Sequence, residues 1–233
     1  MCAVGRRSAL IITADDYGYH PSYDTGILEA AGARAVDAVS VMVLRESMDP
    51  EALLDTRVEI GLHLELPEGP HGRVEAGEEE AVLAALREQL ERFEEVFGRP
   101  ATHLDGHHHC HARCGGAADI AREAAARGLP VRSVDEPHRA LLRRLGAATP
   151  DRLVGRLSEE AESALPPELR PAVEEGADLP PGVTEWMVHP GHSAPGTGSG
   201  YDQAREEDLD LLLSLSADPA LSAARLPHAG ALS

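Results

Sequence analysis

Lysine is absent from this sequence, and all 21 basic residues are arginines. Mechanisms that need a lysine, such as Schiff-base formation or phosphate binding by a P-loop, are therefore excluded. Basic residues are also few beside the 40 acidic ones, which gives a net charge of −19 with the histidines neutral. Such a charge repels phosphate backbones and anionic lipids, so we expect neither nucleic acid nor a membrane as a partner.

Cysteines, aromatic residues and long apolar runs are scarce as well. Three cysteines are too few for a disulfide framework. With 3% aromatic residues, a sugar-stacking surface would depend on a few rings such as Trp186 or Tyr201. No apolar run approaches the roughly 20 residues that span a bilayer. The short run before Asp15 lacks the cleavage pattern of a secretory signal, so we expect a cytoplasmic protein.

Short apolar runs alternate with helical patterns along the chain. This order favours parallel strands joined by helical crossovers, in a single domain over residues 1–233. The predicted strands cover residues 9–16, 35–44, 59–66, 101–109, 130–134 and 184–189. Helices are predicted from about Ser22, which would cap the first of them, over residues 77–98, up to Gly128 and over residues 203–215. Residues 136–180 are predicted to be helical or irregular and to vary within any family.

Two architectures agree with this order of elements, a (β/α) barrel and an open doubly wound sheet. The barrel is favoured because the unusual polar residues follow the strands, where barrel enzymes carry their catalytic groups. No G-x-G-x-x-G pattern follows the first strand, which argues against a dinucleotide-binding fold.

Two adjacent carboxylates, Asp15 and Asp16, end the first predicted strand. They repel each other, and burial beside an apolar strand is costly unless a cation compensates them. Because neighbouring strand residues face opposite sides, one can bind a metal ion while the other faces water or substrate. The alternative is a helix cap or a turn. His63, in the third strand, is a further candidate ligand or a hydrogen-bonded core histidine.

Five of the 12 histidines fall within residues 102–111, in the segment THLDGHHHCH. A strand here would turn His108 to one face. It would place on the other face a column made of His103, Asp105, His107, His109 and His111. Such a column suits a divalent cation and the groups that orient its ligands. The alternatives are a nonspecific histidine-rich tract and a structural zinc site that uses Cys110 and Cys114.

His189 ends the last predicted strand. Pro190 stiffens the backbone after it, and Gly191 allows the close approach of a ligand. Alone, His189 could be a histidine in a turn. Four candidate sites at the ends of four different strands nevertheless favour one shared site over four unrelated explanations.

Four segments of the chain resemble, in order and spacing, the motifs of the YdjC-like carbohydrate deacetylases, which include the chitooligosaccharide deacetylases. These segments are ADDYG (14–18), GLHL (61–64), THLDGHHHCH (102–111) and HPGH (189–192). The likeness continues through Tyr201 and Arg205, so it covers nearly the whole chain. It implies a distorted, incomplete (β/α) barrel related to the polysaccharide deacetylases, with one divalent metal ion.

Matched motif by motif, the resemblance implies Asp16, His63 and His107 as metal ligands and Asp15 as general base. Family members are described with magnesium. The two imidazoles by themselves favour zinc or another transition ion, because Mg²⁺ prefers oxygen ligands. Residues 112–116 depart from the family pattern, and so does the region after residue 136, which puts the identity of the substrate in doubt.

These points predict a hydrolase that removes N-acetyl groups from an amino sugar or from an oligosaccharide or glycoside containing N-acetylglucosamine. A metal-activated water would attack, Asp15 would take its proton, and His189 would protonate the leaving amine. The residues expected to orient ligands or contact substrate are Asp105, His109, His111 and Arg132, the last of which could instead neutralise Asp15. The alternatives are hydrolysis of another amide or of a phosphoester, and metal or sugar binding without catalysis. A homodimer is compatible with the sequence.

Overall fold

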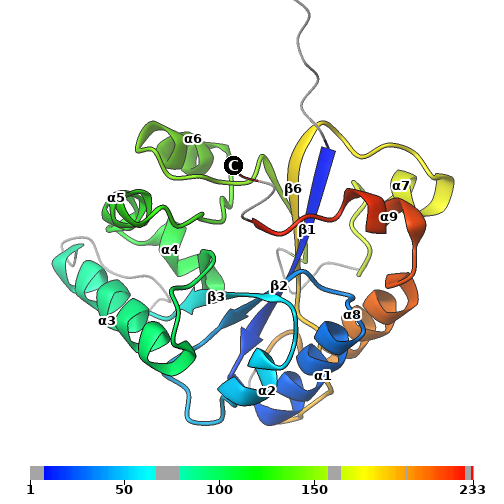
Figure 1. The fold of residues 1–233 in the computed structure, drawn as a ribbon, viewed down its shortest axis with the longest axis horizontal. Helices are drawn as coiled ribbons and strands as arrows, with labels where there is room; N and C mark the ends of the chain where they lie inside the picture. Colours follow the sequence, from blue (N-terminus) through cyan, green and yellow to red (C-terminus); the bar gives the residue numbers. More distant parts are fainter. Residues whose placement is uncertain (1–7, 67–78, 157–163, 198, 229–231, 233) are drawn as a thin grey trace, which may run out of the picture.

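The structure is a computed structural model that describes residues 8–66, 79–156, 164–197, 199–228 and 232. One curled sheet of six parallel strands forms its core, in the order β4-β3-β2-β1-β6-β5 (Figure 1). The strands are β1 (Ser8–Tyr17), β2 (Ala38–Val41), β3 (Glu59–Leu64), β4 (Leu104–Gly106), β5 (Arg152–Gly155) and β6 (Gly182–Val188). This is the predicted incomplete (β/α) barrel.

Strand β1 lies in the middle of the sheet and pairs in parallel with β2 and β6. Its residues after Ser8 are all buried, as expected for a strand covered on both faces. The register aligns Ala14 with Val39 of β2 and with Val188 of β6. The residues that follow these strands are therefore brought to the same end of the barrel.

Helices surround the curled sheet (Figure 1). The longer ones are α1 (Pro21–Gly32), α3 (Glu79–Phe97), α5 (Ala117–Arg127), α6 (Glu136–Arg144) and α8 (Asp202–Leu215). The shorter ones are α2 (Pro50–Leu54), α4 (Cys110–Arg113), α7 (Arg170–Glu175), α9 (Pro219–Ala224) and the 3₁₀ turn η1 (His107–His109). Helix α3 buries apolar side chains at steps of three and four residues, as its sequence predicts. Within the described residues, no helix combines the length and apolar character needed to cross a membrane.

Three strand predictions are corrected by the structure. The strand predicted over residues 101–109 shrinks to β4, because the backbone turns into η1 at His107. Residues 130–134 contribute an isolated bridge to Leu104 in place of a strand. Strand β5 lies within residues 136–180, where the sequence predicts no strand. It was missed because its four residues are too few to show an alternating pattern.

The start of α1 also differs from its prediction. The helix begins at Pro21, and the residue that caps it is His20. The Nδ1 atom of His20 accepts a hydrogen bond of 3.2 Å from the backbone N–H of Ser22. Neither carboxylate of the Asp15–Asp16 pair caps this helix, so the alternative interpretation of the pair as a helix cap is wrong.

The segment of residues 225–228 crosses the N-terminal ends of several strands. It forms a parallel bridge to Leu10 on β1 and an ion pair with Asp37, just before β2. It also donates a backbone hydrogen bond of 2.6 Å to Glu59 at the start of β3. The end of the chain therefore ties together the strands at the side opposite to their C-terminal ends.

Helix α1 packs against the loop after β6 through two glycines. A Cβ atom on Gly26 would lie 2.5 Å from the Cα atom of Gly191, and a Cβ on Gly191 would meet Tyr23 at 3.0 Å. Gly191 therefore allows close packing of a helix, whereas the sequence suggested close approach of a ligand. It is not among the residues that line the pocket.

We expect Gly26→Ala to destabilise the protein by about 1–3 kcal/mol, because the added methyl group overlaps a neighbouring backbone. Gly32→Ala on the same helix is the matched control, since nothing lies within 4 Å of a Cβ placed there. That control should be neutral or slightly stabilising, because alanine favours the helix. Urea denaturation measures both changes, and equal effects would contradict the packing argument.

Candidate active site

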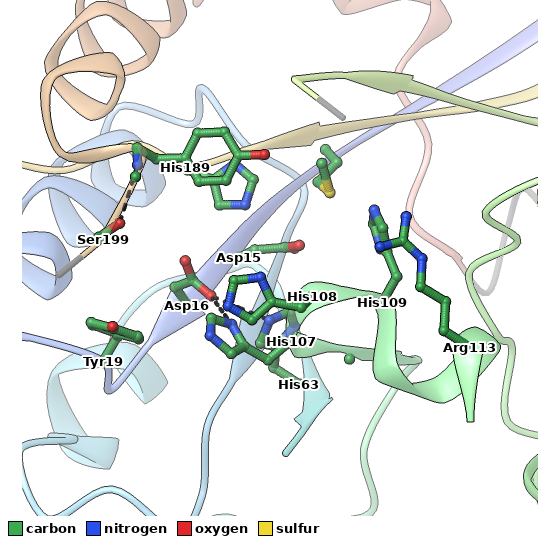
Figure 2. A pocket seen from close by; sticks show the side chains of 14 residues that line it. Asp15, Asp16, Tyr19, His63, His107, His108, His109, Arg113, His189 and Ser199 are labelled. Atoms are coloured by element: carbon green, nitrogen blue, oxygen red, sulfur yellow. Dashed lines mark hydrogen bonds and ion pairs between the residues drawn. The ribbon is translucent and has the colours of Figure 1, made fainter. Parts of the chain in front are cut away.

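Polar residues in the C-terminal parts of β1 and β3, and others just after β4 and β6, line one pocket (Figure 2). Six residues predicted for the site are among them: Asp15, Asp16, His63, His107, His109 and His189. The other lining residues are Tyr19, Gly106, His108, Arg113, Met187, Ser199, Gly200 and Tyr201. The C-terminal end of the barrel thus gathers side chains that are far apart in the sequence, as the fold predicts.

Asp16 has a left-handed backbone conformation (φ 72°), which is uncommon for a residue with a side chain. Its Oδ1 atom lies 3.2 Å from His63 Nε2 and 3.1 Å from His107 Nδ1. Its Oδ2 atom accepts a hydrogen bond of 2.6 Å from Arg205. Burial by itself would raise the pKa of Asp16, but Arg205 and the two histidines lower the pKa well below its usual value. Asp16 is therefore an anion at neutral pH.

Asp16, His63 and His107 each offer one atom that can bind a metal ion, and these three atoms lie within 4.8 Å of one another. One carboxylate oxygen and two imidazole nitrogens suit zinc or another transition ion better than Mg²⁺. A second set of three groups shares His63 and includes Asp15 and Asp105. Arg132 holds both oxygens of Asp15, and Asp105 uses one oxygen for His63 and the other for Ser40 and Arg132. Asp16 also pairs with an arginine, but only through Oδ2, so its Oδ1 atom still faces the two histidines. The first set therefore fits a metal ion better.

The Nδ1 side of the His63 ring contacts Asp105, which is fully buried. The Nδ1 atom of His63 donates a hydrogen bond of 2.7 Å to Asp105 Oδ1, so that Nε2 faces Asp16. Burial opposes protonation, but the charge of Asp105 and the hydrogen bonds to both carboxylates raise the pKa of His63 well above its usual value. A metal ion would displace the proton from Nε2, while the proton on Nδ1 would remain there, hydrogen-bonded to Asp105.

Arg132 is buried and pairs with three carboxylates. Its closest contacts are 2.5 Å to Asp15, 2.7 Å to Asp105 and 2.9 Å to Glu185. Burial raises the pKa of Asp15, and the opposing effect of Arg132 offsets this rise only in part. The pKa of Asp16, by contrast, lies well below its usual value. Adjacent carboxylates with pKa values driven apart are typical of sites where one accepts a proton and the other stays ionised.

The ion-paired cluster around the pocket carries an excess of negative charge. Its carboxylates are Asp15, Asp16, Asp105 and Glu185, and its guanidinium groups are Arg132 and Arg205. With His63 neutral, the formal charge of this cluster is about −2. Burying such a net charge is energetically unfavourable unless a cation compensates it. A divalent cation bound to Asp16 would compensate it.

His189 lies on the other side of Asp16 from His107 (Figure 2). Its ring stacks on Tyr201, with centroids 4.6 Å apart and an interplanar angle of 10°. Its backbone N–H donates a hydrogen bond of 2.9 Å to Asp208. The Nδ1 atom is buried and has no hydrogen-bond partner among the described residues. Burial lowers the pKa of His189 to about 4, so the ring is neutral at pH 7.

The predicted column along residues 102–111 is wrong beyond β4. His108 and His109 both have left-handed backbone conformations (φ 50° and 58°), so the alternation of a strand ends there. His108 lines the pocket, although the strand pattern turns it away. His111 lies behind the pocket wall, where its Nε2 atom is 3.0 Å from the carbonyl oxygen of Arg132.

The structure also bears on the alternative zinc site at the cysteines and on the aromatic rings that could stack on a sugar. Cys110 and Cys114 are free thiols, and neither belongs to a metal-binding group in the part of the chain that the structure describes. Trp186 is 1% exposed and cannot offer a face to a sugar. Tyr201 does line the pocket, and so does Tyr19, which is not predicted from the sequence.

Three residues that pair with buried charged groups of the site are not predicted from the sequence: Ser40 contacts Asp105, Glu185 contacts Arg132, and Arg205 contacts Asp16. Glu185 carried a usable signal, because a charged residue inside the apolar strand GVTEWMV needs a buried partner. The sequence signal of Arg205 is weaker, since amphipathic helices commonly expose arginines. Only the resemblance to the family draws attention to this residue. Ser40 looks like any small residue of a buried strand.

Comparisons with known proteins show the family of this chain. The model of the family described as YdjC-like protein matches residues 9–223. The chitooligosaccharide deacetylase of Serratia marcescens is 32% identical, over 92% of this chain and 93% of that protein. The carbohydrate deacetylase of Mus musculus is 35% identical, over 53% of this chain and 49% of that protein. The match thus spans about half the length of the mouse relative.

The fold also has a solved counterpart. A crystal structure from Enterococcus faecalis V583, described as that of a candidate cellobiose-phosphate cleavage protein, superposes with a TM-score of 0.74. The two chains are 22% identical, and the match covers 97% of this chain and 100% of the other. The family match over residues 9–223 and the Serratia relative lead to one conclusion. This chain belongs to the YdjC-like family.

Proposed function

We propose that this chain is a metal-dependent hydrolase that removes the acetyl group from an N-acetylated amino sugar, such as an oligosaccharide or glycoside of N-acetylglucosamine. The observation that carries the proposal is the convergence of Asp16, His63 and His107 in one pocket, with Asp15 as a second, differently titrating carboxylate beside them. The names of the curated relatives, carbohydrate deacetylase and chitooligosaccharide deacetylase, support the substrate class.

Asp16, His63 and His107 would hold one divalent ion, for which their donor atoms favour zinc or another transition ion. When bound, such an ion polarises the acetamide carbonyl and makes a water molecule acidic enough to attack at neutral pH. Arg205 keeps Asp16 ionised by pairing with the oxygen that faces away from the two histidines.

Asp15 accepts the proton of the attacking water. It lines the pocket, and one of its oxygens lies within 4.8 Å of a ring nitrogen of His63. Its raised pKa makes it a stronger base than a free carboxylate. Arg132 holds both oxygens of the carboxylate, at 2.5 and 2.8 Å, and so fixes its orientation.

His189 delivers a proton to the leaving amine. At rest the ring is neutral because of its low pKa, so the proton reaches it during the reaction, after Asp15 has taken it from water. A low pKa makes the protonated ring a strong donor. The charges of Asp15 and Asp16 stabilise that transient cation, and Tyr201 holds the ring by stacking.

The remaining predicted residues act around this core. Asp105 orients His63, and His111 contacts the backbone of Arg132, so neither faces the substrate. His109 lines the pocket and is the one of this group placed to contact a sugar hydroxyl.

The test is acetate release from N-acetylglucosamine oligosaccharides by the purified chain, before and after removal of metal with a chelator. We expect the activity to be lost on chelation and restored by Zn²⁺ more fully than by Mg²⁺. Phosphoester substrates are assayed in parallel. Tight zinc binding without acetate release would overturn the catalytic proposal, and turnover of phosphoesters alone would overturn the substrate class.

A further inference from the structure

A buried chain of hydrogen bonds runs from His63 away from the pocket. Asp105 accepts one hydrogen bond from His63 on Oδ1 and another, of 2.7 Å, from Ser40 on Oδ2. The Oγ atom of Ser40 lies 3.0 Å from His103 Nε2. Ser40 and His103 are 0% and 2% exposed, and neither lines the pocket. They cannot touch a substrate, so any role in the site must act through Asp105.

The protons in this chain can be assigned from its donors and acceptors. Ser40 has one hydroxyl proton, and the ionised carboxylate of Asp105 can only accept it. The Ser40 oxygen must therefore accept a hydrogen bond from His103, which places an N–H on His103 Nε2. On the other side of Asp105, the same reasoning places the proton of His63 on Nδ1. Both histidines thus direct an N–H toward the carboxylate, one directly and one through the serine.

The ring of His103 is held on several sides. A Cβ atom on Gly61 would overlap the ring, so a glycine is needed at that position of β3. Thr102 Oγ1 lies 2.9 Å from His103 Nδ1 and 3.0 Å from the carbonyl oxygen of Ile60, so its one hydroxyl proton has these two acceptors. The ring of His228 stacks on it, with centroids 4.1 Å apart and an interplanar angle of 5°. Two conspicuous sequence segments, GLHL and THLD, thus contribute Gly61, Thr102 and His103 to one rigid support.

We propose that His103 and Ser40 are positioning residues, which hold Asp105 so that His63 keeps its proton on Nδ1 and presents Nε2 to the metal ion. This inference rests on the proposed metal-dependent function. Arg132 also contacts Asp105 Oδ2, at 2.7 Å, and anchors the carboxylate from the side of Asp15. Ser40 holds the same oxygen from the side of His103. Two contacts on Oδ2 limit the rotation of the carboxylate and keep Oδ1 directed at His63.

The experiment measures zinc affinity by competition with a chromophoric chelator, in Ser40→Ala, His103→Leu and His103→Gln. We expect the first two to bind zinc roughly tenfold more weakly than the parent, as is typical when a partner of a metal ligand is lost. The side-chain amide of glutamine can place an N–H close to the position of Nε2. His103→Gln should therefore retain most of the affinity, although it removes the imidazole.

A second readout separates positioning from simple stability. In the zinc-loaded parent, NMR of ¹⁵N-labelled histidines should show His63 protonated at Nδ1 only, and Ser40→Ala should broaden or shift that signal. Thr149→Val is the control, because it removes a buried hydroxyl that has no partner among the described residues and does not line the pocket. It should leave zinc affinity unchanged.

Zinc affinity and a His63 spectrum equal to those of the parent in Ser40→Ala and His103→Leu would overturn the inference, even if the variants melt at lower temperature. Loss of affinity in His103→Gln as large as in His103→Leu would also contradict it. Acetate release is measured on the parent alone. A parent that binds zinc but releases no acetate would overturn the proposed function and leave the positioning role standing.

Discussion

Asp15→Asn should keep its bound metal ion and lose turnover of an N-acetylated amino sugar by about 10²–10⁴-fold, the range typical of a lost general base. Asparagine has nearly the shape of aspartate, but its amide cannot accept a proton from water. Arg132 keeps its ion pairs with Asp105 and Glu185 in this variant, so the fold should persist. Zinc content by mass spectrometry and acetate release measure the two expectations separately.

Asp16→Asn is the matched control, because it makes the same chemical change one residue further along the chain. Asparagine tolerates the left-handed backbone of this position (φ 72°), so no new strain is introduced. This variant should lose the metal ion and the activity together, since Asp16 supplies the oxygen ligand between His63 and His107. Full activity of Asp15→Asn, or loss of metal from both variants, would refute the division of roles between the two carboxylates.

The parts of the fold that follow from local pattern were predictable. Strand β3 (Glu59–Leu64) alternates apolar and polar residues, and α3 repeats apolar residues at helical spacing, so each is visible in a short window of sequence. Strand β5 (Arg152–Gly155) was not visible, because four residues gain their strand conformation from pairing with β6. The end of β4 was equally hidden, since the turn into η1 requires two left-handed histidines that only tertiary packing can support.

The site shows the same division between local and distant causes. Asp15, Asp16 and His63 stand out because polar residues rarely end apolar strands, and the family likeness selected His107 from five neighbouring histidines. Arg205 reaches Asp16 from a helix 189 residues further along the chain. No local pattern could reveal that contact. The charge balance of the pocket, which depends on it, becomes visible only in three dimensions.

Arg132→Met should lower the free energy of unfolding by about 3–5 kcal/mol at pH 7, because it leaves buried carboxylates without their shared cation. Arg132 is 2% exposed and pairs with Asp15, Asp105 and Glu185. Methionine fills much of the same volume, so the loss reports mainly on charge. Urea denaturation of the parent and the variant measures this loss.

Arg122→Met is the matched control for the lost charge. Arg122 pairs on the surface with Asp119, so its replacement should change the free energy of unfolding by less than about 0.5 kcal/mol.

The pH dependence tests the cause of this loss. In the parent, Arg132 and His63 outweigh burial and hold the pKa of Asp105 well below its usual value. Asp105 therefore contributes stability above its unfolded pKa, and this contribution disappears as the pH falls through the folded value. Without Arg132, the buried carboxylates bind protons more readily than they do in the unfolded chain. The stability difference between parent and variant should therefore shrink as the pH falls from 7 toward about 4, since protonation removes the charge that Arg132 would have balanced. A difference that stays constant over this range would show that Arg132 stabilises the barrel by packing alone.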